Sequence, residues 1–405
     1  SHAAAYALIA YQTAFLKAHY TDEYMASLMS GDMGNTEQVV KFILDSKDMG
    51  IDVESPDVNR SMYQCTAVGK DKILLGLGVI KGLGGEAIKS ILTERESGRF
   101  TSIFDLCRRV DLRKVNKKAL EALCLAGAMK NIAKNRATAF NSIAKAIKNA
   151  SYVNDMAAAG QVDLFGFTEQ ETDTDDSFEK ECRSEEWGLR ELLINEKKAL
   201  GMYFSGHIID EDSHWRKYAS FSNLAKVQEP SSDGQNMRII ASMIAPPLRR
   251  KTKRGSILYI LNIDDERERV DCLVSEDVFA SVKDSVKVDD VVILEAKVSR
   301  DMQKERNKLS VSRVQPIKDF IDESFSNLSI GVKSSKADSH KLQSLLNTLK
   351  QNAENNPDNP KRAITIKIDC DDVVVNFDEF EKRFSIYEFV NAYNQEIVDG
   401  VVIEI

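Results

Sequence analysis

Three carboxylates near the end of the sequence, Asp369, Asp371 and Asp372, come closest to a catalytic spacing. Metal-dependent phosphoryl transfer needs carboxylates that converge on two cations. Here the three aspartates fall in one acidic turn between two short predicted strands, where solvated loop residues are common. The sequence contains neither a P-loop nor a nucleophile elbow. We predict no catalytic residue, no metal site and no cofactor in this chain, and an enzyme that acts through these aspartates is kept as an alternative.

A docking peptide is indicated by one hexapeptide, which consists of Gln161, Val162, Asp163, Leu164, Phe165 and Gly166. Between Gln161 and Glu191, eleven acidic residues stand against three basic ones, a net charge of −8. A segment of that composition has little apolar surface from which to build a core of its own. We therefore expect Leu164 and Phe165 to pack on a partner. A turn of amphipathic helix on this chain's own surface is the alternative.

A helix-hairpin-helix pattern begins at Gly76, where an apolar helical turn runs into a glycine-rich hairpin and then into a helix that ends near Arg95. Glycines permit a tight turn with positive φ and leave amide N–H groups uncovered at a helix N-terminus, which can bind a backbone phosphate without reading sequence. The sequence predicts a second unit downstream, with a basic turn from Arg108 to Lys114 and a helix from Asn116 to Gly127. The pattern therefore predicts a tandem module.

The tandem module coincides with the most basic part of the chain. From Lys70 to Ala150, seventeen Lys and Arg stand against seven acids, a net charge of +10 in a protein whose formal charge is −8. Such a block is expected of a module that binds a polyanion, whereas a helical bundle solvated by its lysines is the alternative. The residues that we expect on duplex DNA are Lys81, Gly82, Gly84, Gly85, Lys89, Arg113, Lys114 and Lys117.

From Met237 the apolar period changes from helical to alternating. Five short strands over some 80 residues, with a helix between the third and the fourth, indicate an OB-fold β-barrel. Its first loop, from Leu248 to Gly255, is rich in basic residues and lies where OB-folds commonly meet single-stranded nucleic acid. Aromatic residues for base stacking are sparse. The candidates for single-stranded DNA contact are Arg249, Arg250, Lys251, Lys253, Arg254 and Tyr259.

The rest of the chain is less specific. Residues 1 to about 50 have the spacing of helices, and the acidic stretch from Lys318 to Ile405 is typical of a small α/β module. His207 and His214 lack further ligands at metal-binding spacing, and the six cysteines form no C-x-x-C pair, so we expect reduced, structural thiols. No apolar run is long enough for a membrane span and no signal peptide is evident. We expect a cytoplasmic protein without a membrane partner.

Three groups of segments are specific enough to compare with a known family. They are Ser1-His2-Ala3-Ala4-Ala5-Tyr6-Ala7-Leu8 with Tyr11-Gln12-Thr13-Ala14, Ile103-Phe104-Asp105-Leu106-Cys107 with Val110-Asp111-Leu112, and Glu196-Lys197-Lys198-Ala199-Leu200-Gly201 with Ser205-Gly206-His207. By these segments the sequence resembles the alpha subunits of bacterial replicative DNA polymerase III, and the resemblance covers the whole chain as their carboxy-terminal third. One departure is Ile208, where the family commonly has Pro.

The resemblance implies a multidomain fold. Its first half is mostly α-helical with tandem helix-hairpin-helix units, and a five-stranded OB-fold barrel and a small α/β module follow. The implied parts are the helical end of the fingers domain (1–64), the duplex-binding tandem helix-hairpin-helix (65–150), the clamp-binding peptide with an acidic linker and a helix (151–236), the OB-fold (237–317), and an acidic α/β tail that binds the tau subunit of the clamp loader (318–405).

The resemblance also implies roles for single residues and partners. His2 would approach the incoming nucleotide, and the hexapeptide would enter a pocket of the sliding clamp, the beta subunit, with Gln161, Leu164 and Phe165 as contacts. The family's catalytic aspartates lie in a palm domain that this chain lacks, so we expect it to be inactive alone, with Mg²⁺ needed only by the complete polymerase. Primer-template DNA is the expected nucleic acid.

Besides the alternative of an enzyme that acts through the three aspartates, two functions remain open at this point. One is the DNA-holding and clamp-docking part of a replicative polymerase, which confers processivity by tethering. The other is a stand-alone repair scaffold that binds DNA through the same helix-hairpin-helix and OB-fold modules. The second predicts a natural amino terminus close to Ser1, and the reading frame upstream would distinguish the two.

Overall fold

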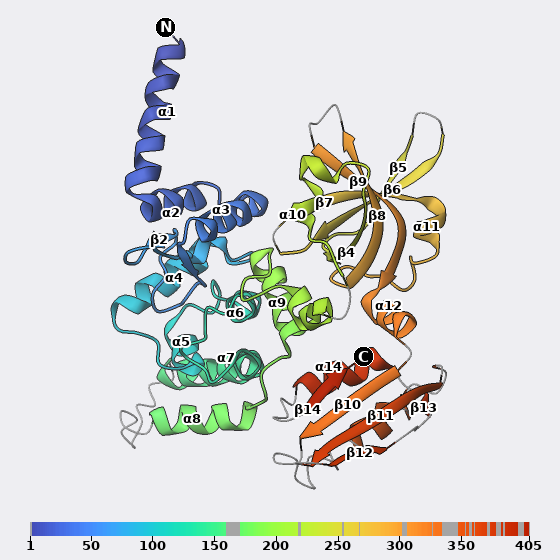
Figure 1. Cartoon of the computed structure of the whole chain (residues 1–405). Coiled ribbons are helices and arrows are strands. Elements are labelled where there is room, and N and C mark those ends of the chain that lie inside the picture. The colour runs from blue at the N-terminus through green and yellow to red at the C-terminus, as the bar shows by residue number, and fades with distance from the viewer. Residues whose placement is uncertain are drawn as a thin grey trace. The chain divides into compact units, whose positions relative to one another are not determined.

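Helices build the first half of the chain, and strands build most of the second (Figure 1). By contacts between residues, the chain divides into two units, Ser1–Gly206 and His207–Ile405. The five-part functional division is finer and stays a prediction. The computed structural model describes residues 2–158, 171–217, 220–252, 255–266, 268–301, 306–325, 327–333, 347–352, 354–355, 359, 361–370, 373–377, 382–383, 385–395 and 401–404.

The first unit opens with three helices, in the region where the apolar spacing predicts helical structure. The Asn35 side chain caps the third of them by accepting a hydrogen bond from the N–H of Gln38. A small sheet with the strand order β1-β3-β2 follows. The elements are α1 (His2–His19), α2 (Thr21–Gly31), α3 (Thr36–Asp48), β1 (Asp52–Glu54), β2 (Thr66–Ala67) and β3 (Lys72–Leu74).

Helices of the two hairpins and their supports complete this unit. One apolar core extends from Met25 in α2 to Met202, just after α9, so the hairpins rest on the same core as the first helices. The elements are the 3-10 helix η1 (Leu77–Val79) and the helices α4 (Gly85–Glu96), α5 (Ile103–Arg109), α6 (Lys117–Leu125), α7 (Arg136–Ala158), α8 (Glu171–Cys182) and α9 (Leu189–Leu200).

Helix α8 lies in the acidic segment, where the charge pattern does not predict packing on this chain. Its Phe178 ring lies 5.5 Å from the Phe104 ring of α5, measured between ring centroids, and packs against the core of the unit. Part of the acidic segment is thus fixed to the chain by an aromatic contact that local composition does not reveal. The hexapeptide from Gln161 to Gly166 lies outside the described residues.

The second unit contains an OB-fold barrel. Its main strands follow the order β4-β8-β9-β7-β6, and pairing between β4 and β6 closes the barrel. Strands β7 and β9 are parallel, and α11 lies between β7 and β8 in sequence, as predicted. The elements are β4 (Asn236–Met243), β6 (Ile257–Asp264), β7 (Arg269–Ser275), α11 (Glu276–Ala280), β8 (Val291–Asp301) and β9 (Arg306–Pro316).

The predicted first loop of the barrel needs a correction. Residues Leu248–Lys251 form an additional strand, β5, which pairs with the first half of β6 and makes the sheet six-stranded rather than five-stranded. Four consecutive residues without apolar alternation give no strand signal of their own. The strand forms because β6 extends past the point where β4 pairs with it and offers an unpaired edge.

A small α/β module ends the chain. Its sheet has the order β12-β11-β10-β14, with β10 parallel to β11, and β13 pairs with β11. The module thus combines helices and strands, as the sequence predicts. The elements are α12 (Ile317–Ser324), β10 (Asn327–Lys333), β11 (Lys361–Cys370), β12 (Val373–Phe377), β13 (Lys382–Arg383), α14 (Ile386–Gln395) and β14 (Val401–Glu404).

The segment before the barrel joins this module by aromatic and polar contacts. It consists of η2 (Ile208–Lys217), α10 (Leu224–Val227) and η3 (Pro230–Ser232). Trp215 of η2 is fully buried, stacks on Tyr387 of α14 and donates a hydrogen bond from Nε1 to Asn391 Oδ1 at 3.1 Å. Tyr387 in turn donates to Asp212 Oδ1 at 2.8 Å. The final module is therefore held by residues some 170 positions earlier in the chain.

Candidate nucleic-acid interface

The first hairpin is a glycine turn between η1 and α4. Gly82 has a φ of +81°, the left-handed conformation that favours glycine, as predicted. Gly84 is the N-cap residue of α4, and Leu83 between the two glycines is buried and anchors the turn. Gly82, Gly84 and Gly85 themselves are exposed. The turn thus presents backbone at the N-terminus of α4, where the helix dipole favours an anion.

The second hairpin lies directly against the first. The backbone N–H of Asp111 donates to Ser90 Oγ on α4 at 3.1 Å, and Lys114 Nζ lies 3.4 Å from Glu86 Oε2 at the start of that helix. Asn116 caps α6 by accepting a hydrogen bond from the N–H of Ala119. Ser90 and Glu86 were not among the predicted site residues, because nothing in their local sequence indicates that they join the two hairpins.

The predicted cations of the hairpins all lie on the surface, but they differ in the ion pairs that they form. Lys81, Lys89, Arg113, Lys114 and Lys117 are exposed. Lys89 forms no ion pair with a carboxylate among the described residues. The hydrogen bond from the Arg113 guanidinium lowers the pKa of the Asp111 carboxyl, so part of the Arg113 charge is already balanced. Lys117 Nζ lies 3.6 Å from Glu121 Oε1, a weak solvated pair.

Lys81 also contacts the end of helix α9, which its local sequence does not indicate. Its backbone N–H donates to the carbonyl oxygen of Ala199 near the end of α9, at 2.7 Å. A Cβ placed on Gly201 would lie 2.6 Å from Lys81 Nζ, so the ammonium lies over the C-terminus of α9. This is the negative end of the helix dipole, which favours a cation. Lys81 therefore also holds the hairpin to α9.

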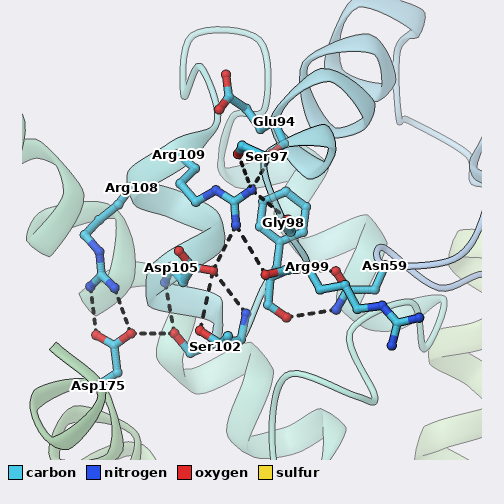
Figure 2. A network of polar contacts seen from close by, with 12 residues as sticks. Asn59, Glu94, Ser97, Gly98, Arg99, Ser102, Asp105, Arg108, Arg109 and Asp175 are labelled. Atoms are coloured by element: carbon cyan, nitrogen blue, oxygen red, sulfur yellow. Dashed lines mark hydrogen bonds and ion pairs between the residues drawn. The ribbon is translucent and has the colours of Figure 1, made fainter. Parts of the chain in front are cut away.

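Several arginines of the basic block point inward and bind this chain. Figure 2 shows Arg109 between the end of α4 and the start of α5. Its guanidinium donates to the carbonyl oxygens of Glu94, Gly98 and Arg99, and also to Ser97 Oγ and Asp105 Oδ2. Its guanidinium carbon lies 4.5 Å from the centroid of the Phe100 ring. These donors and this charge are engaged within the fold.

Arg108 and Arg95 are engaged in the same way. Arg108 forms a two-point ion pair with Asp175 of α8, at 2.7 and 2.9 Å (Figure 2). Arg95 Nη1 donates to the carbonyl oxygens of Val58 and Ser61 at 3.0 and 2.7 Å, and burial lowers the pKa of its guanidinium. The net charge of the block therefore overstates the positive surface. The lysines and Arg113 carry most of what remains for a ligand.

The cations of the barrel lie on β5. Arg249, Arg250 and Lys251 are exposed, whereas Lys253 and Arg254 lie outside the described residues. Tyr259, which we predicted as a base-stacking candidate, instead stacks on Phe279 of α11 with ring centroids 4.0 Å apart. Both rings also pack against the barrel core. Tyr259 thus already has an aromatic partner within the chain.

The other predicted site residues provide little structural evidence for a site. The side chains of His2 and Asp369 are not described, and Asp371 and Asp372 lie outside the described residues with the hexapeptide. His207 Nε2 lies 3.2 Å from Asp264 Oδ1, and the His214 ring lies beside the Trp215 ring. Over the described parts of the chain, no cluster of His, Cys, Asp and Glu could hold a metal ion. None of the helices described there combines the length and apolar character that a bilayer crossing requires.

Comparisons with known proteins agree with both the hairpins and the resemblance. The family described as "Helix-hairpin-helix motif" matches residues 50–139, which include both hairpins. DNA polymerase III subunit alpha of Pseudomonas fluorescens is 34% identical over 337 residues, which cover 79% of this chain and 28% of that protein. The same subunit of Escherichia coli K12 is 32% identical over 370 residues, which cover 91% of this chain and 31% of that protein.

This chain is a homologue of the DNA polymerase III alpha subunits. It spans less than a third of the length of these curated relatives. The matched part is their carboxy-terminal region. The predicted family is thus confirmed. This match alone does not assign the activity or the partners of the whole alpha subunit to this chain.

Solved structures similar to part of this alpha-subunit homologue include a single-stranded DNA binding protein and an OB-fold domain. The second single-stranded DNA binding protein of Mycobacterium smegmatis is 14% identical, with a TM-score of 0.19, and covers 20% of this chain and 84% of that one. The second OB-fold domain of replication protein A from Methanococcus maripaludis is 18% identical, with a TM-score of 0.18, and covers 24% and 96%. The OB-fold assignment rests on the strand order described above, not on these scores.

The Glu196 and Ser205 segments, which carry part of the alpha-subunit resemblance, are joined by one buried carboxylate. Glu196 is fully buried and pairs with Arg136 at 2.7 Å. It also accepts hydrogen bonds from the N–H groups of Phe204 and Ser205, both at 2.8 Å, and from the Ser205 hydroxyl. A buried carboxylate is tolerated only with such partners. The Glu196 and Ser205 segments are therefore constrained as one unit, and Ile208 after them is buried at the start of η2.

Proposed function

We propose that this chain is the DNA-holding and partner-docking part of a replicative DNA polymerase III alpha subunit. The observation that carries the proposal is the pair of adjoining hairpins, with an exposed glycine turn in the first and exposed cations in both. The names of the relatives favour this role over a stand-alone repair scaffold. Catalysis belongs to a different part of such a polymerase, so the isolated chain should not extend primed DNA with nucleotides and Mg²⁺.

The proposed duplex contact is electrostatic and independent of base sequence. Backbone amides at the N-terminus of α4 would bind one phosphate, and the surface lysines would neutralise its neighbours. Contacts of this kind position a protein on DNA but carry no sequence information. A polymerase that copies every sequence needs that property.

The proposed protein partners are the sliding clamp and the tau subunit of the clamp loader. The hexapeptide from Gln161 to Gly166 would dock on the clamp through Leu164 and Phe165, and the acidic tail would contact tau. The peptide falls between α7 and α8, both of which belong to the same unit as the hairpins. Linking a peptide contact to a DNA contact raises the effective concentration of each, which would make the complete polymerase processive.

Further contacts complete the proposal. The OB-fold would contact template single strand through the cations of β5, and His2 would approach the incoming nucleotide in the complete polymerase. The setting would be the cytoplasm, where bacterial chromosomal DNA is copied. Mg²⁺ would be required by the complete polymerase and not by this chain.

Duplex binding is tested by replacing Lys81 and Lys89 with Ala. We expect weaker binding on every duplex sequence, and a salt dependence that flattens by about one unit per lost phosphate contact. Lys41→Ala with Lys226→Ala removes the same charge from exposed positions outside the hairpins. If this control weakens binding as much as the hairpin variant does, the hairpins have no specific role.

Clamp docking is tested by replacing Leu164 and Phe165 with Ala. Anchor residues that fill a pocket should cost about 2 kcal/mol or more of binding free energy in a calorimetric titration with the clamp. Thr168→Ala with Gln170→Ala, in the same part of the sequence, is the matched control. Unchanged clamp affinity in the Leu164 and Phe165 variant would reject the docking role.

A further inference from the structure

The segment Glu196–Gly201 carries part of the alpha-subunit resemblance and includes none of the predicted DNA or protein contacts. It forms the last residues of α9 and the C-cap of that helix, Gly201, whose φ of +80° is left-handed. Ala199 is buried in the same apolar core as Leu83 of the first hairpin. The hydrogen bond from the backbone N–H of Lys81 to Ala199 places the end of α9 beside the glycine turn.

The glycine turn is held by backbone hydrogen bonds, both within itself and to α9. The N–H of Leu83 donates to the carbonyl oxygen of Ile80 at 3.3 Å, which closes a β-turn with Gly82, at a φ of +81°, in its third position. The N–H of Lys81, the second residue of this turn, donates to the carbonyl oxygen of Ala199 at 2.7 Å. The last carbonyl groups of a helix have no donor within the helix, so this bond satisfies one of them.

The Lys81 side chain lies against Gly201, where the absence of a Cβ leaves room for it. An added Cβ would lie 2.6 Å from Lys81 Nζ and would also clash with Thr36 Cγ2 of α3. The ammonium therefore lies at the C-terminus of α9, the negative end of the helix dipole. Lys89 differs, because it is exposed and forms no ion pair with a carboxylate among the residues that the structure describes.

The end of α9 is itself fixed by the Glu196 carboxylate. This group is fully buried, pairs with Arg136 of α7 and accepts hydrogen bonds from the N–H groups of Phe204 and Ser205. The chain before Gly201 and the chain after it are thus bound to one carboxylate. A turn that donates a hydrogen bond to this segment has a fixed position relative to the core of the unit.

We propose that the segment Glu196–Gly201 positions the first hairpin for DNA, with Lys81 as a positioning residue and Lys89 as the cation that neutralises phosphate. This inference rests on the proposed duplex contact of the hairpins and divides the two lysines between two tasks. Lys81 holds the turn so that the amides at the N-terminus of α4 face a phosphate. Its loss should weaken binding without changing the number of phosphates that cations neutralise, which the salt slope measures.

The test compares four single variants of the full chain on one DNA duplex over a range of salt, after circular dichroism has shown which of them are folded. Lys89→Met should weaken binding and flatten the salt slope by about one unit. Lys81→Met should weaken binding about two- to fivefold, as for the loss of a charge at a helix terminus, with the slope unchanged. Gly201→Ala should weaken binding at least as much, also with an unchanged slope.

Gly50→Ala is the matched control for Gly201→Ala. Gly50 has a similar φ of +81°, but an added Cβ there would meet no atom within 4 Å. The control therefore introduces the same backbone strain without moving Lys81, and its duplex affinity should equal that of the wild-type chain. Since Lys81→Met keeps both glycines, it decides the question even if Gly201→Ala does not fold.

Three results would overturn the inference and leave the duplex contact standing. They are a flatter salt slope in Lys81→Met, which would make Lys81 a phosphate ligand, an unchanged affinity in that variant, and equal weakening in Gly201→Ala and Gly50→Ala. If Lys89→Met leaves both the affinity and the slope unchanged, the proposed duplex contact at the first hairpin fails, and the inference fails with it.

Discussion

The Arg108 guanidinium of α5 and the Asp175 carboxylate of α8, two residues 67 positions apart in sequence, form a two-point ion pair. Only 16% of the Arg108 side chain and 7% of the Asp175 side chain are exposed, and Ser102 donates a further hydrogen bond to Asp175 at 2.6 Å. The pair fixes α8 to α5. Since α8 begins shortly after the proposed docking peptide, the pair limits how far that peptide's attachment can move from the hairpins.

Replacing Asp175 with Asn should release α8 and destabilise the first unit by about 3 kcal/mol, because it leaves the buried Arg108 without its charged partner. Urea unfolding measures the loss, and limited proteolysis should show faster cleavage within α8. Glu86→Gln, which breaks the exposed pair with Lys114, should cost about 1 kcal/mol or less. Equal costs for the two variants would show that burial of the Arg108 pair has no energetic consequence.

Two glycines of the first hairpin should respond to alanine with opposite signs. Gly82 has a φ of +81°, so Gly82→Ala should destabilise the chain by about 1 to 2 kcal/mol. Gly85 begins α4, and a Cβ there would meet no atom within 4 Å, so Gly85→Ala should stabilise it by about 0.5 kcal/mol. Urea unfolding of both variants checks this. A stable Gly82→Ala would mean that the turn does not need the left-handed conformation.

Buried thiols should resist alkylation in the folded chain. Burial raises the pKa of Cys107 and of Cys124 to about 12 and also raises that of Cys272, and the thiolate is the reactive form. In a Cys370→Ser background, iodoacetamide at pH 8 should modify the partly exposed Cys182 first, as mass spectrometry would show. Early modification of Cys107 or Cys124 would contradict their burial.

The same thiols should make the fold less stable at high pH. Their ordinary pKa is 9.0, so the unfolded chain loses these protons at a pH where the folded chain keeps them. Their contribution to stability is therefore complete below about pH 9 and falls as the pH rises toward about 12. Cys107→Ala with Cys124→Ala should flatten the decline of urea stability above pH 9, and an unchanged slope would contradict it.

His207 should protect the second unit against acid. Burial tends to raise the pKa of Asp264, but the hydrogen bond with His207 and the Arg269 charge outweigh it and hold the pKa below 3.8. A carboxyl with a lowered pKa stabilises the fold above its unfolded pKa, and this contribution is lost as the pH falls through its folded pKa. His207→Ala should therefore shift acid unfolding to higher pH, whereas His207→Gln keeps a donor and should shift it less.

Trp215 reports this acid transition. The chain has two tryptophans, so Trp187→Phe leaves fluorescence from Trp215 in the second unit alone. Identical acid midpoints for the wild-type residue and for His207→Ala would show that the contact with Asp264 does not affect stability.

Local patterns in the sequence were sufficient for the elements that form from neighbouring residues. Apolar spacing predicted helical structure over residues 1 to about 50, and period-two alternation predicted the main barrel strands. The glycines from Gly76 to Gly85 predicted the first hairpin and a tight turn, in which Gly82 has a positive φ. The basic residues from Leu248 to Gly255 predicted a loop, whereas Leu248–Lys251 form strand β5. An edge strand depends on its partner more than on its own residues.

The sequence by itself determined the family, the order of the modules and the residue types that each presents. Only the tertiary structure decided which charges stay on the surface: Arg108 and Arg109 bind acceptors within the fold, whereas Lys89 is exposed. It also decided that the Tyr259 ring stacks on the Phe279 ring rather than standing alone on the surface. The physical reason is that a helix or turn is encoded by adjacent residues, while the partner of a guanidinium or a ring comes from distant ones and exists only after folding.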